Sequence, residues 1–172
     1  MEFQNKIFES KTFKNENFTD KSFKDSRFTD CTFENCNLSN VVLKNTRIQN
    51  GIFNECKIMG LNFSECSKFL VGFTFNNCLI SMSFFSDLDL KNIVFDNCQI
   101  FECDFNHTNL TRANFENSDL KNTCFSNSNL SFASFKNAKN YSIDPNQNTL
   151  NKTKFSIPDV IGLLDNFNII LE

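Results

Sequence analysis

Residues 103–122 read CDFNH TNLTR ANFEN SDLKN, four groups of five with a Phe or a Leu at the centre of each group. The same spacing of five links thirteen large apolar residues without a miss from Phe3 to Phe63, and it resumes from Leu70 to Phe135. Neither the 3.6-residue period of an α-helix nor the two-residue alternation of a strand produces this spacing. A short repeat of fixed period is typical of a solenoid, in which each unit buries its apolar residue only by stacking on its neighbours.

A second regularity lies two residues before each central residue, at a position we call the small position. It holds small or medium side chains such as Ala113 and Ser118, while the other three positions are rich in polar residues. One large and one small inward residue in five predict a short flat face followed by a turn. Four such faces close a square coil of 20 residues, so side chains 20 apart are expected to stack. The sequence agrees, because one such column would contain Phe75, Phe95, Phe115, Phe135 and Phe155.

This pattern resembles the pentapeptide-repeat family, whose consensus is a small residue, Asn or Asp, Leu or Phe, and two variable polar residues. Ala113-Asn114-Phe115-Glu116-Asn117 is a close copy, and so is the unit that follows it. The resemblance covers about residues 1–155. It implies an all-β solenoid, a right-handed quadrilateral β-helix of about seven coils. The first units depart from the consensus because charged residues occupy the small position, and we expect looser early coils there. These residues are Lys6, Lys11, Glu16 and Lys21.

The repeat domain, residues 1–155, contains one irregularity. Between Phe63 and Leu70 the spacing is seven instead of five, so two residues are inserted near 64–69. We expect a bulge or small loop that rotates the second block of coils relative to the first. Phe73, a bulky residue at the small position just after the break, is expected to fill the space that the irregularity opens.

Residues 156–172 form the second segment, a predicted C-terminal α-helix with a short tail. Ser156-Ile157-Pro158-Asp159 resembles a capping box with Pro in the first turn. An open coil end exposes unpaired strand edges, so the helix is expected to cap it. The segment is more apolar than a cap requires, and similar family members carry such a helix, so we expect a homodimer through it. The predicted dimerisation residues are Val160, Ile161, Leu163, Leu164, Phe167, Ile169 and Leu171.

Composition argues against chemistry at a catalytic or metal site. Seven of the eight cysteines fall at the small position, where a thiol acts as a small hydrophobe, and only Cys124 faces outward as a reactive thiol. No tightly spaced cysteine pair suits zinc. His107 is the sole histidine, and no glycine-rich phosphate loop occurs. We therefore expect no enzyme activity, no catalytic or metal-binding residues and no cofactor.

Charge and hydropathy limit the classes of partner that the protein could bind. The net charge is −3 with both signs interspersed, which argues against direct nucleic-acid binding. The chain enters the repeat at Phe3 without a signal peptide, and no apolar run is long enough for a membrane span. We expect a cytoplasmic protein that does not contact the membrane.

Two surface features depart from the repeat. Residues 67–120 carry seven acidic residues against three basic ones, an acidic band that would either meet a basic partner or form a solvated face. The band consists of Asp87, Asp89, Asp96, Glu102, Asp104, Glu116 and Asp119. Large apolar residues also occupy outward positions. Met82, Phe84 and Phe101 are expected to cluster at one corner of two successive coils, and Phe132 stands elsewhere. That cluster would be an interaction site, or else it would be covered by a dimer partner or by neighbouring side chains.

Two functions compete. The first is a non-enzymatic binding or structural module whose partner is unassigned. The alternative comes from the resemblance to Qnr- and MfpA-type members, which implies a DNA mimic that binds bacterial DNA gyrase and topoisomerase IV, both type II topoisomerases, and protects them from quinolones. Duplex DNA carries one negative charge per about 1.7 Å, whereas this chain has a net charge of only −3. We therefore prefer the first.

Overall fold

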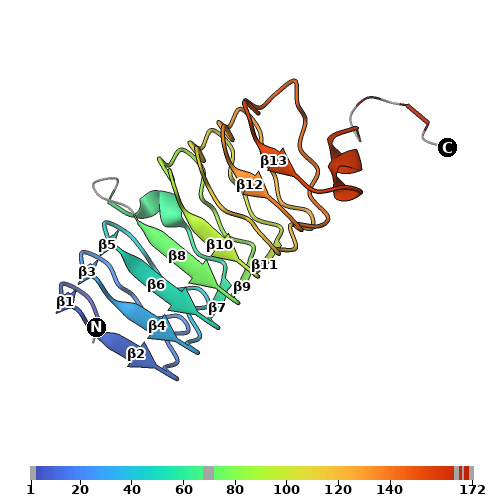
Figure 1. Cartoon of the computed structure of the whole chain (residues 1–172). Coiled ribbons are helices and arrows are strands. Elements are labelled where there is room, and N and C mark those ends of the chain that lie inside the picture. Colours follow the sequence, from blue (N-terminus) through green and yellow to red (C-terminus); the bar gives the residue numbers. More distant parts are fainter. Residues whose placement is uncertain (1–2, 68–71, 165–166, 168, 171–172) are drawn as a thin grey trace.

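The chain winds as a rod of about seven stacked coils, with the first described coil at one end of the rod and residues 154–164 at the other (Figure 1). The structure is a computed structural model that describes residues 3–67, 72–164, 167, 169 and 170. Each coil has four faces, which we name A to D in the order in which the chain visits them. All strand pairs are parallel and join one coil to the next. The sense in which the coils wind stays a prediction.

Three of the faces carry short strands. Face A contains β2 (Thr12–Lys14), β4 (Thr32–Glu34), β6 (Gly51–Asn54), β8 (Phe73–Asn76) and β10 (Val94–Asp96), followed by the pair β12 (Ser134–Phe135) and β13 (Lys154–Phe155). Face B contains β7 (Lys57–Met59), β9 (Leu79–Ser81) and β11 (Gln99–Phe101). Face D contains β1 (Ile7–Glu9), β3 (Arg27–Thr29) and β5 (Arg47–Gln49). Face C is held by single bridges that join Asn62, Phe84, Asp104 and Cys124 in succession.

The turns between faces depend on one backbone conformation. Two residues after most of the central residues, the chain adopts positive φ, and we call this residue the corner residue. Among the described residues, positive φ occurs at 26 non-glycine positions, of which 14 are Asn and 4 are Asp, the types that tolerate the left-handed region best. Their side chains also join neighbouring coils. Asn97 Nδ2 donates to Asn77 Oδ1 at 2.6 Å, and Asn50 Nδ2 donates to Asp30 Oδ1 at 2.8 Å.

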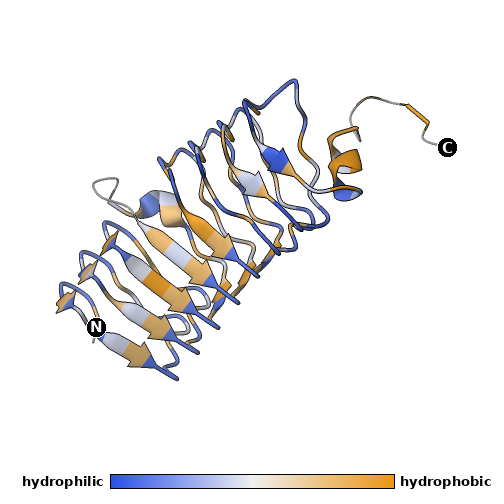
Figure 2. Ribbon diagram, in the orientation of Figure 1, coloured by the Kyte–Doolittle hydropathy of each residue, from blue (hydrophilic) through white to orange (hydrophobic). Residues whose placement is uncertain are grey.

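The core consists of the stacked columns that the 20-residue period predicts. Along face A the ring centroids of Phe75 and Phe95 lie 5.0 Å apart, and those of Phe95 and Phe115 lie 5.1 Å apart. The face C column meets this one edge-on, with Phe95 and Phe105 at 5.6 Å and 85°. In β2, β4, β6, β8 and β10 the buried central Phe is followed by a hydrophilic residue (Figure 2).

Several side chains at the small position donate hydrogen bonds to backbone carbonyls of the preceding coil, and the first described coil has no preceding coil to receive them. Ser118 Oγ donates to the Phe95 carbonyl at 3.0 Å, and Cys98 Sγ donates to the Phe75 carbonyl at 3.4 Å, so these side chains reach back toward the preceding coil. In the first described coil the charged residues at this position are exposed, and Lys11 Nζ lies 4.8 Å from the Phe13 ring. The expectation of looser early coils is wrong, because β1 pairs with β3, and β2 with β4, in full register. The charges cover the open end of the core instead.

The two-residue insertion leaves the faces aligned. Phe53 pairs with Phe75 and Ile58 with Ile80, a separation of 22 that replaces the usual 20. The predicted rotation of the second block is therefore wrong, because the extra residues are accommodated between β7 and β8. A 3-10 turn, η1 (Phe63–Glu65), begins this segment; Leu70 lies outside the described residues. Phe73 is buried as expected and packs edge-on against Phe63 at 5.2 Å.

The predicted C-terminal α-helix is wrong. The segment forms only a 3-10 turn, η2 (Asp159–Leu164), in which the Ile161 amide donates to the Pro158 carbonyl at 3.1 Å. An isolated helix of about ten residues is marginal in water, and Gly162 lowers helix propensity further. The Gly162 backbone instead packs closely against the Tyr141 carbonyl. With Leu163 packed against the core, the turn lies across the last coil.

Candidate interaction surfaces

The apolar side chains Met82, Phe84 and Phe101 meet where face B turns into face C, and we call them the apolar corner. The Met82 amide donates to the Phe101 carbonyl at 3.0 Å, which places the corner residue of one coil against the next coil. Met82 is 47% exposed and Phe84 is 51% exposed, whereas Phe101 is half-buried. The three residues thus lie together as the spacing predicts. Neighbouring side chains leave the first two uncovered, and their role in binding stays a prediction.

Three acidic residues of the predicted band border this corner, and we call them the acidic rim. Asp104 pairs with Phe84 along face C. Glu102, directly after Phe101, is a corner residue with φ 54°. It is the equivalent of Met82 one coil further along the rod. Asp119 pairs with Gln99 on face B. The structure therefore joins part of the acidic band to the apolar corner, a juxtaposition that follows from the offsets within the coil.

The other four acids lie on other parts of the rod. Asp96 and Glu116 lie on face A, Asp89 lies on face D, and Asp87 is a corner residue between faces C and D. The band therefore circles the rod instead of forming one acidic face. Asp96 and Glu116 are stacked neighbours, but each has a donor. Asn117 Nδ2 donates to Asp96 Oδ1 at 3.1 Å, and Ser134 Oγ donates to Glu116 Oε1 at 2.7 Å.

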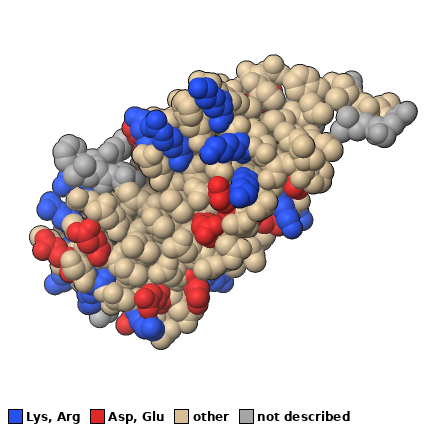
Figure 3. Space-filling model, in the orientation of Figure 1, with Lys and Arg blue, Asp and Glu red and all other residues tan. Residues whose placement is uncertain are grey.

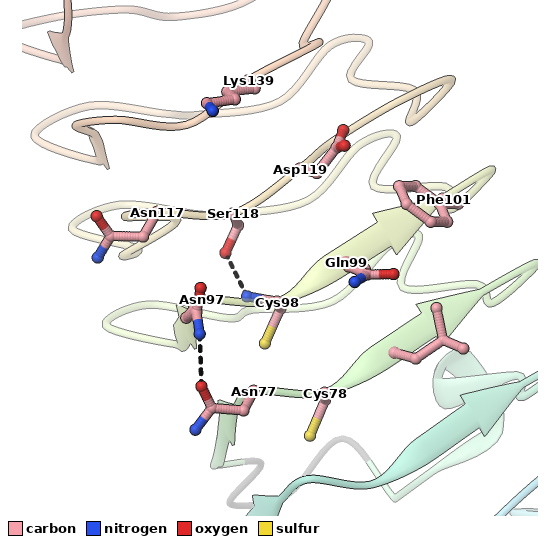
Figure 4. Close-up of a pocket in the computed structure, with 11 residues that line it drawn as sticks. Asn77, Cys78, Asn97, Cys98, Gln99, Phe101, Asn117, Ser118, Asp119 and Lys139 are labelled. Carbon is pink, nitrogen blue, oxygen red and sulfur yellow. Dashed lines mark hydrogen bonds between the residues drawn. The ribbon is translucent and has the colours of Figure 1, made fainter.

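A shallow groove runs along face B up to the apolar corner (Figure 4). The Cys98 amide donates to Ser118 Oγ at 2.9 Å in this groove, and the Asn77–Asn97 bond forms one side of it. Phe101 lies at the other side with Leu79 and Asp119, so the groove and the apolar corner share a wall. Of these lining residues, the sequence singled out Phe101 and Asp119 but not Leu79, which is also an outward apolar residue.

Two models of the repeat match this chain in sequence. The model described as "Pentapeptide repeat region" matches residues 26–102, and the model described as "Pentapeptide repeats (8 copies)" matches residues 98–137. The chain belongs to the pentapeptide-repeat family. No curated protein matches it in sequence.

Solved structures share the fold of this pentapeptide-repeat protein. A trypsin-treated variant of QnrB1, a plasmid-mediated fluoroquinolone resistance protein, is 15% identical with a TM-score of 0.58, and the match covers 99% of this chain and 93% of that one. A second trypsin-treated QnrB1 variant is 17% identical with a TM-score of 0.52, covering 99% and 92%. At these identities the likeness shows the fold alone.

The C-terminal segment of this pentapeptide-repeat protein exposes apolar side chains beyond the last coil. Of the predicted dimerisation residues, Val160 and Leu163 are half-buried, while Ile161, Leu164, Phe167 and Ile169 are exposed, and Leu171 lies outside the described residues. Ile157 and Ile170, which we did not predict, are about nine-tenths exposed. The turn thus covers the coil end with Leu163 and leaves an apolar surface facing outward.

Reactive groups are sparse along the described parts of the repeat. Cys124 is exposed and the other seven cysteines are buried, as their positions predict. Burial raises the pKa of the Cys66 and Cys103 thiols to about 12. His107 is an exposed corner residue between faces C and D. Within residues 3–67 and 72–164, no three His, Cys, Asp or Glu side chains gather in a way that could hold a metal ion, and no helix is long and apolar enough to cross a membrane.

Proposed function

We propose that this protein is a non-enzymatic protein-binding module that binds its partner through the apolar corner and its acidic rim. The exposure of Phe84 carries the proposal, because half of a large aromatic side chain faces solvent on a rod that buries most of its phenylalanines. Contiguous exposed apolar residues bordered by polar ones are typical of protein interaction sites. Pentapeptide-repeat proteins are generally structural or binding modules.

The chemistry of the corner specifies the partner. Apolar residues at the centre suit an aliphatic or aromatic anchor, which supplies most of the affinity in such contacts. The carboxylates of Glu102, Asp104 and Asp119 favour lysine or arginine around that anchor and accelerate association. The groove on face B extends the surface beyond Phe101, so we expect an extended basic segment with one apolar side chain in its middle.

Site-specific photocrosslinking tests the proposal. A photoreactive phenylalanine analogue at position 84 is expected to yield one discrete adduct in a lysate of the native host. Position 124 is the matched control, because it is exposed and lies on the same ladder of face C two coils further on. Glu102→Lys with Asp104→Lys should abolish the adduct. Equal labelling from position 124, or an adduct indifferent to the charge reversal, would contradict the proposal.

A type II topoisomerase is the second candidate partner, and the fold similarity to QnrB1 supports it. The alternative function is then that of a DNA mimic that confers quinolone protection. The scattered acidic band argues against it, since mimicry of a duplex needs closely spaced charges along the rod. A gyrase supercoiling assay with ciprofloxacin separates the two candidates. Unchanged inhibition at micromolar protein would exclude the mimic, and restored supercoiling would favour it over the unassigned partner.

We also propose that two copies associate through the exposed C-terminal apolar side chains. The support is the outward position of Ile161 and Leu164 on η2. Light scattering after size exclusion should give a dimer for the native chain and a monomer for Ile161→Ser with Leu164→Ser. A monomeric native chain at all concentrations would reject this association.

A further inference from the structure

A second outward aromatic residue, Phe132, lies between faces D and A, diagonally across the coil from the apolar corner. It is the corner residue of its coil, with φ 62°, and it is 41% exposed. Met82 and Phe132 are the only apolar residues among the positive-φ non-glycine residues of the described chain. A bulky side chain is unusual in this conformation, and neither burial nor backbone geometry favours phenylalanine here. Such an outlier points to a functional constraint.

Cations lie on both sides of this ring. Arg112 and Lys152 are the corner residues of the coils before and after, with φ 60° and 55°. The Arg112 guanidinium lies 5.6 Å from the ring centroid, and the Lys152 ammonium lies 5.8 Å from it. At several other corners the equivalent places hold hydrogen-bonded Asn and Asp side chains, such as Asn97 on Asn77, and in earlier coils the same corner holds Asn50 on Asp30. A cation–aromatic–cation column thus replaces the polar ladder at this corner.

The cations of this column have no acidic partner in the described parts of the chain. None of the ion pairs there includes Arg112 or Lys152. Lys154, on β13, is two residues beyond Lys152. Lys91 directly precedes Asn92, the corner residue two coils before Phe132, and it pairs with Asp89 at 3.2 Å. Lys and Arg side chains accordingly gather along the upper edge of the middle coils in Figure 3. The protein carries net charge −3, so this basic column is a local reversal of sign.

We infer that the Arg112–Phe132–Lys152 column is a second docking surface, and that it binds an acidic segment of a partner protein. Charge complementarity selects the occupant: carboxylates on either side of an apolar side chain would meet the two cations while that side chain packs on the edge of Phe132. A nucleic-acid strand fits less well. The stacked carboxylates Asp96 and Glu116 occupy the adjacent face A, where a phosphate backbone would have to continue. Because this surface is of opposite sign to the acidic rim and lies across the rod from it, both can be occupied together.

Binding of a defined acidic probe tests the inference. A fluorescein-labelled peptide of repeated Glu-Glu-Phe triplets should bind the full chain, measured by anisotropy at low salt, and binding should weaken as salt screens the charges. Arg112→Asn with Lys152→Asn should weaken binding about tenfold or more. Phe132→Asn should weaken it about threefold or more. Asn is the commonest corner residue of this fold, so these variants should fold; circular dichroism checks that they do.

The matched control removes the same charge elsewhere. Lys121→Asn with Lys139→Asn deletes two exposed cations distant from this corner and should leave peptide binding within about twofold of the native value. An equal loss in the control, or no binding up to millimolar peptide, overturns the inference. So does tighter, variant-sensitive binding of an oligo-dT strand, because the occupant would then be nucleic acid. Concentration-dependent self-association lost in the Arg112/Lys152 variant would likewise replace the proposed partner with a second copy.

Discussion

Phe105 lies at the centre of the stacked core and offers the most direct test of it. Its side chain is fully buried. Its ring stacks on Phe85 at 4.7 Å and on Phe125 at 5.3 Å, and it meets Phe95 edge-on at 5.6 Å. Phe105→Ala therefore removes one ring from the middle of a column and leaves Phe85 and Phe125 each without a stacking partner on one side.

The expected loss of unfolding free energy follows from the cavity. A buried Phe→Ala change costs about 3–5 kcal/mol, more where the surroundings cannot collapse. Here the spacing of the coils is fixed by backbone bonds such as that from the Phe105 amide to the Cys124 carbonyl at 3.0 Å, so the rings above and below cannot close the gap. Lost ring–ring contacts, each worth about 0.5–1.5 kcal/mol beyond area, place the value near 4–5 kcal/mol. That is a large part of the roughly 5–15 kcal/mol typical of a domain.

Urea unfolding followed by circular dichroism measures this loss, and Phe84→Ala is the matched control. Phe84 is the residue before the neighbouring central Phe85, and it points outward. Its replacement should change stability by about 1 kcal/mol or less, since surface substitutions away from special features are usually small. A loss below about 1 kcal/mol for Phe105→Ala, or equal losses for the two variants, would refute the inward and outward assignment of the repeat.

Four further predictions concern the tyrosine and the cysteines. Tyr141, the only tyrosine, should ionise near pH 12 in a titration at 295 nm, because burial and then the charge of Asp159 raise its pKa to about 12; a midpoint near 10 would show an accessible hydroxyl. Tyr141→Phe should leave stability unchanged or raise it by about 1 kcal/mol in urea unfolding, since its buried hydroxyl has no hydrogen-bond partner among the described residues; a clear loss would reveal such a partner. An Ellman assay at pH 8 should detect one rapidly reacting thiol, Cys124, and Cys124→Ser should remove it. Because the folded pKa values of Cys66 and Cys103 are raised from 9.0 to about 12, their stabilising effect is complete below pH 9 and falls by about 1.4 kcal/mol per pH unit and thiol as the pH rises toward 12; flat stability over that range would contradict the burial of these thiols.

The repeat anticipated most of the interior, because a solenoid contains mainly nearest-neighbour contacts that recur at one period. The stacking of Phe75 on Phe95 and the burial of seven cysteines follow from that period alone. The errors occurred where the repeat ends or breaks. Composition could not show that Lys11 covers the open end of the first coil, that the insertion leaves the faces aligned, or that Gly162 packs against the last coil.

The sequence by itself determined which side chains face inward, because a period of five with one large and one small residue fits only one division between core and surface. It also marked the departures from the repeat: the insertion, the outward aromatics, the acidic residues and the apolar terminus. Only the tertiary structure decided which departures lie together. The four faces place residues that are close in sequence on different sides of the rod, so the acidic band is spread around it. Stacking brings together residues about 20 apart. Phe84 therefore lies beside Asp104, and Phe132 lies between Arg112 and Lys152. Which residues share a surface depends on the face of the coil on which each one lies, and that is decided only when the chain closes into a four-sided coil.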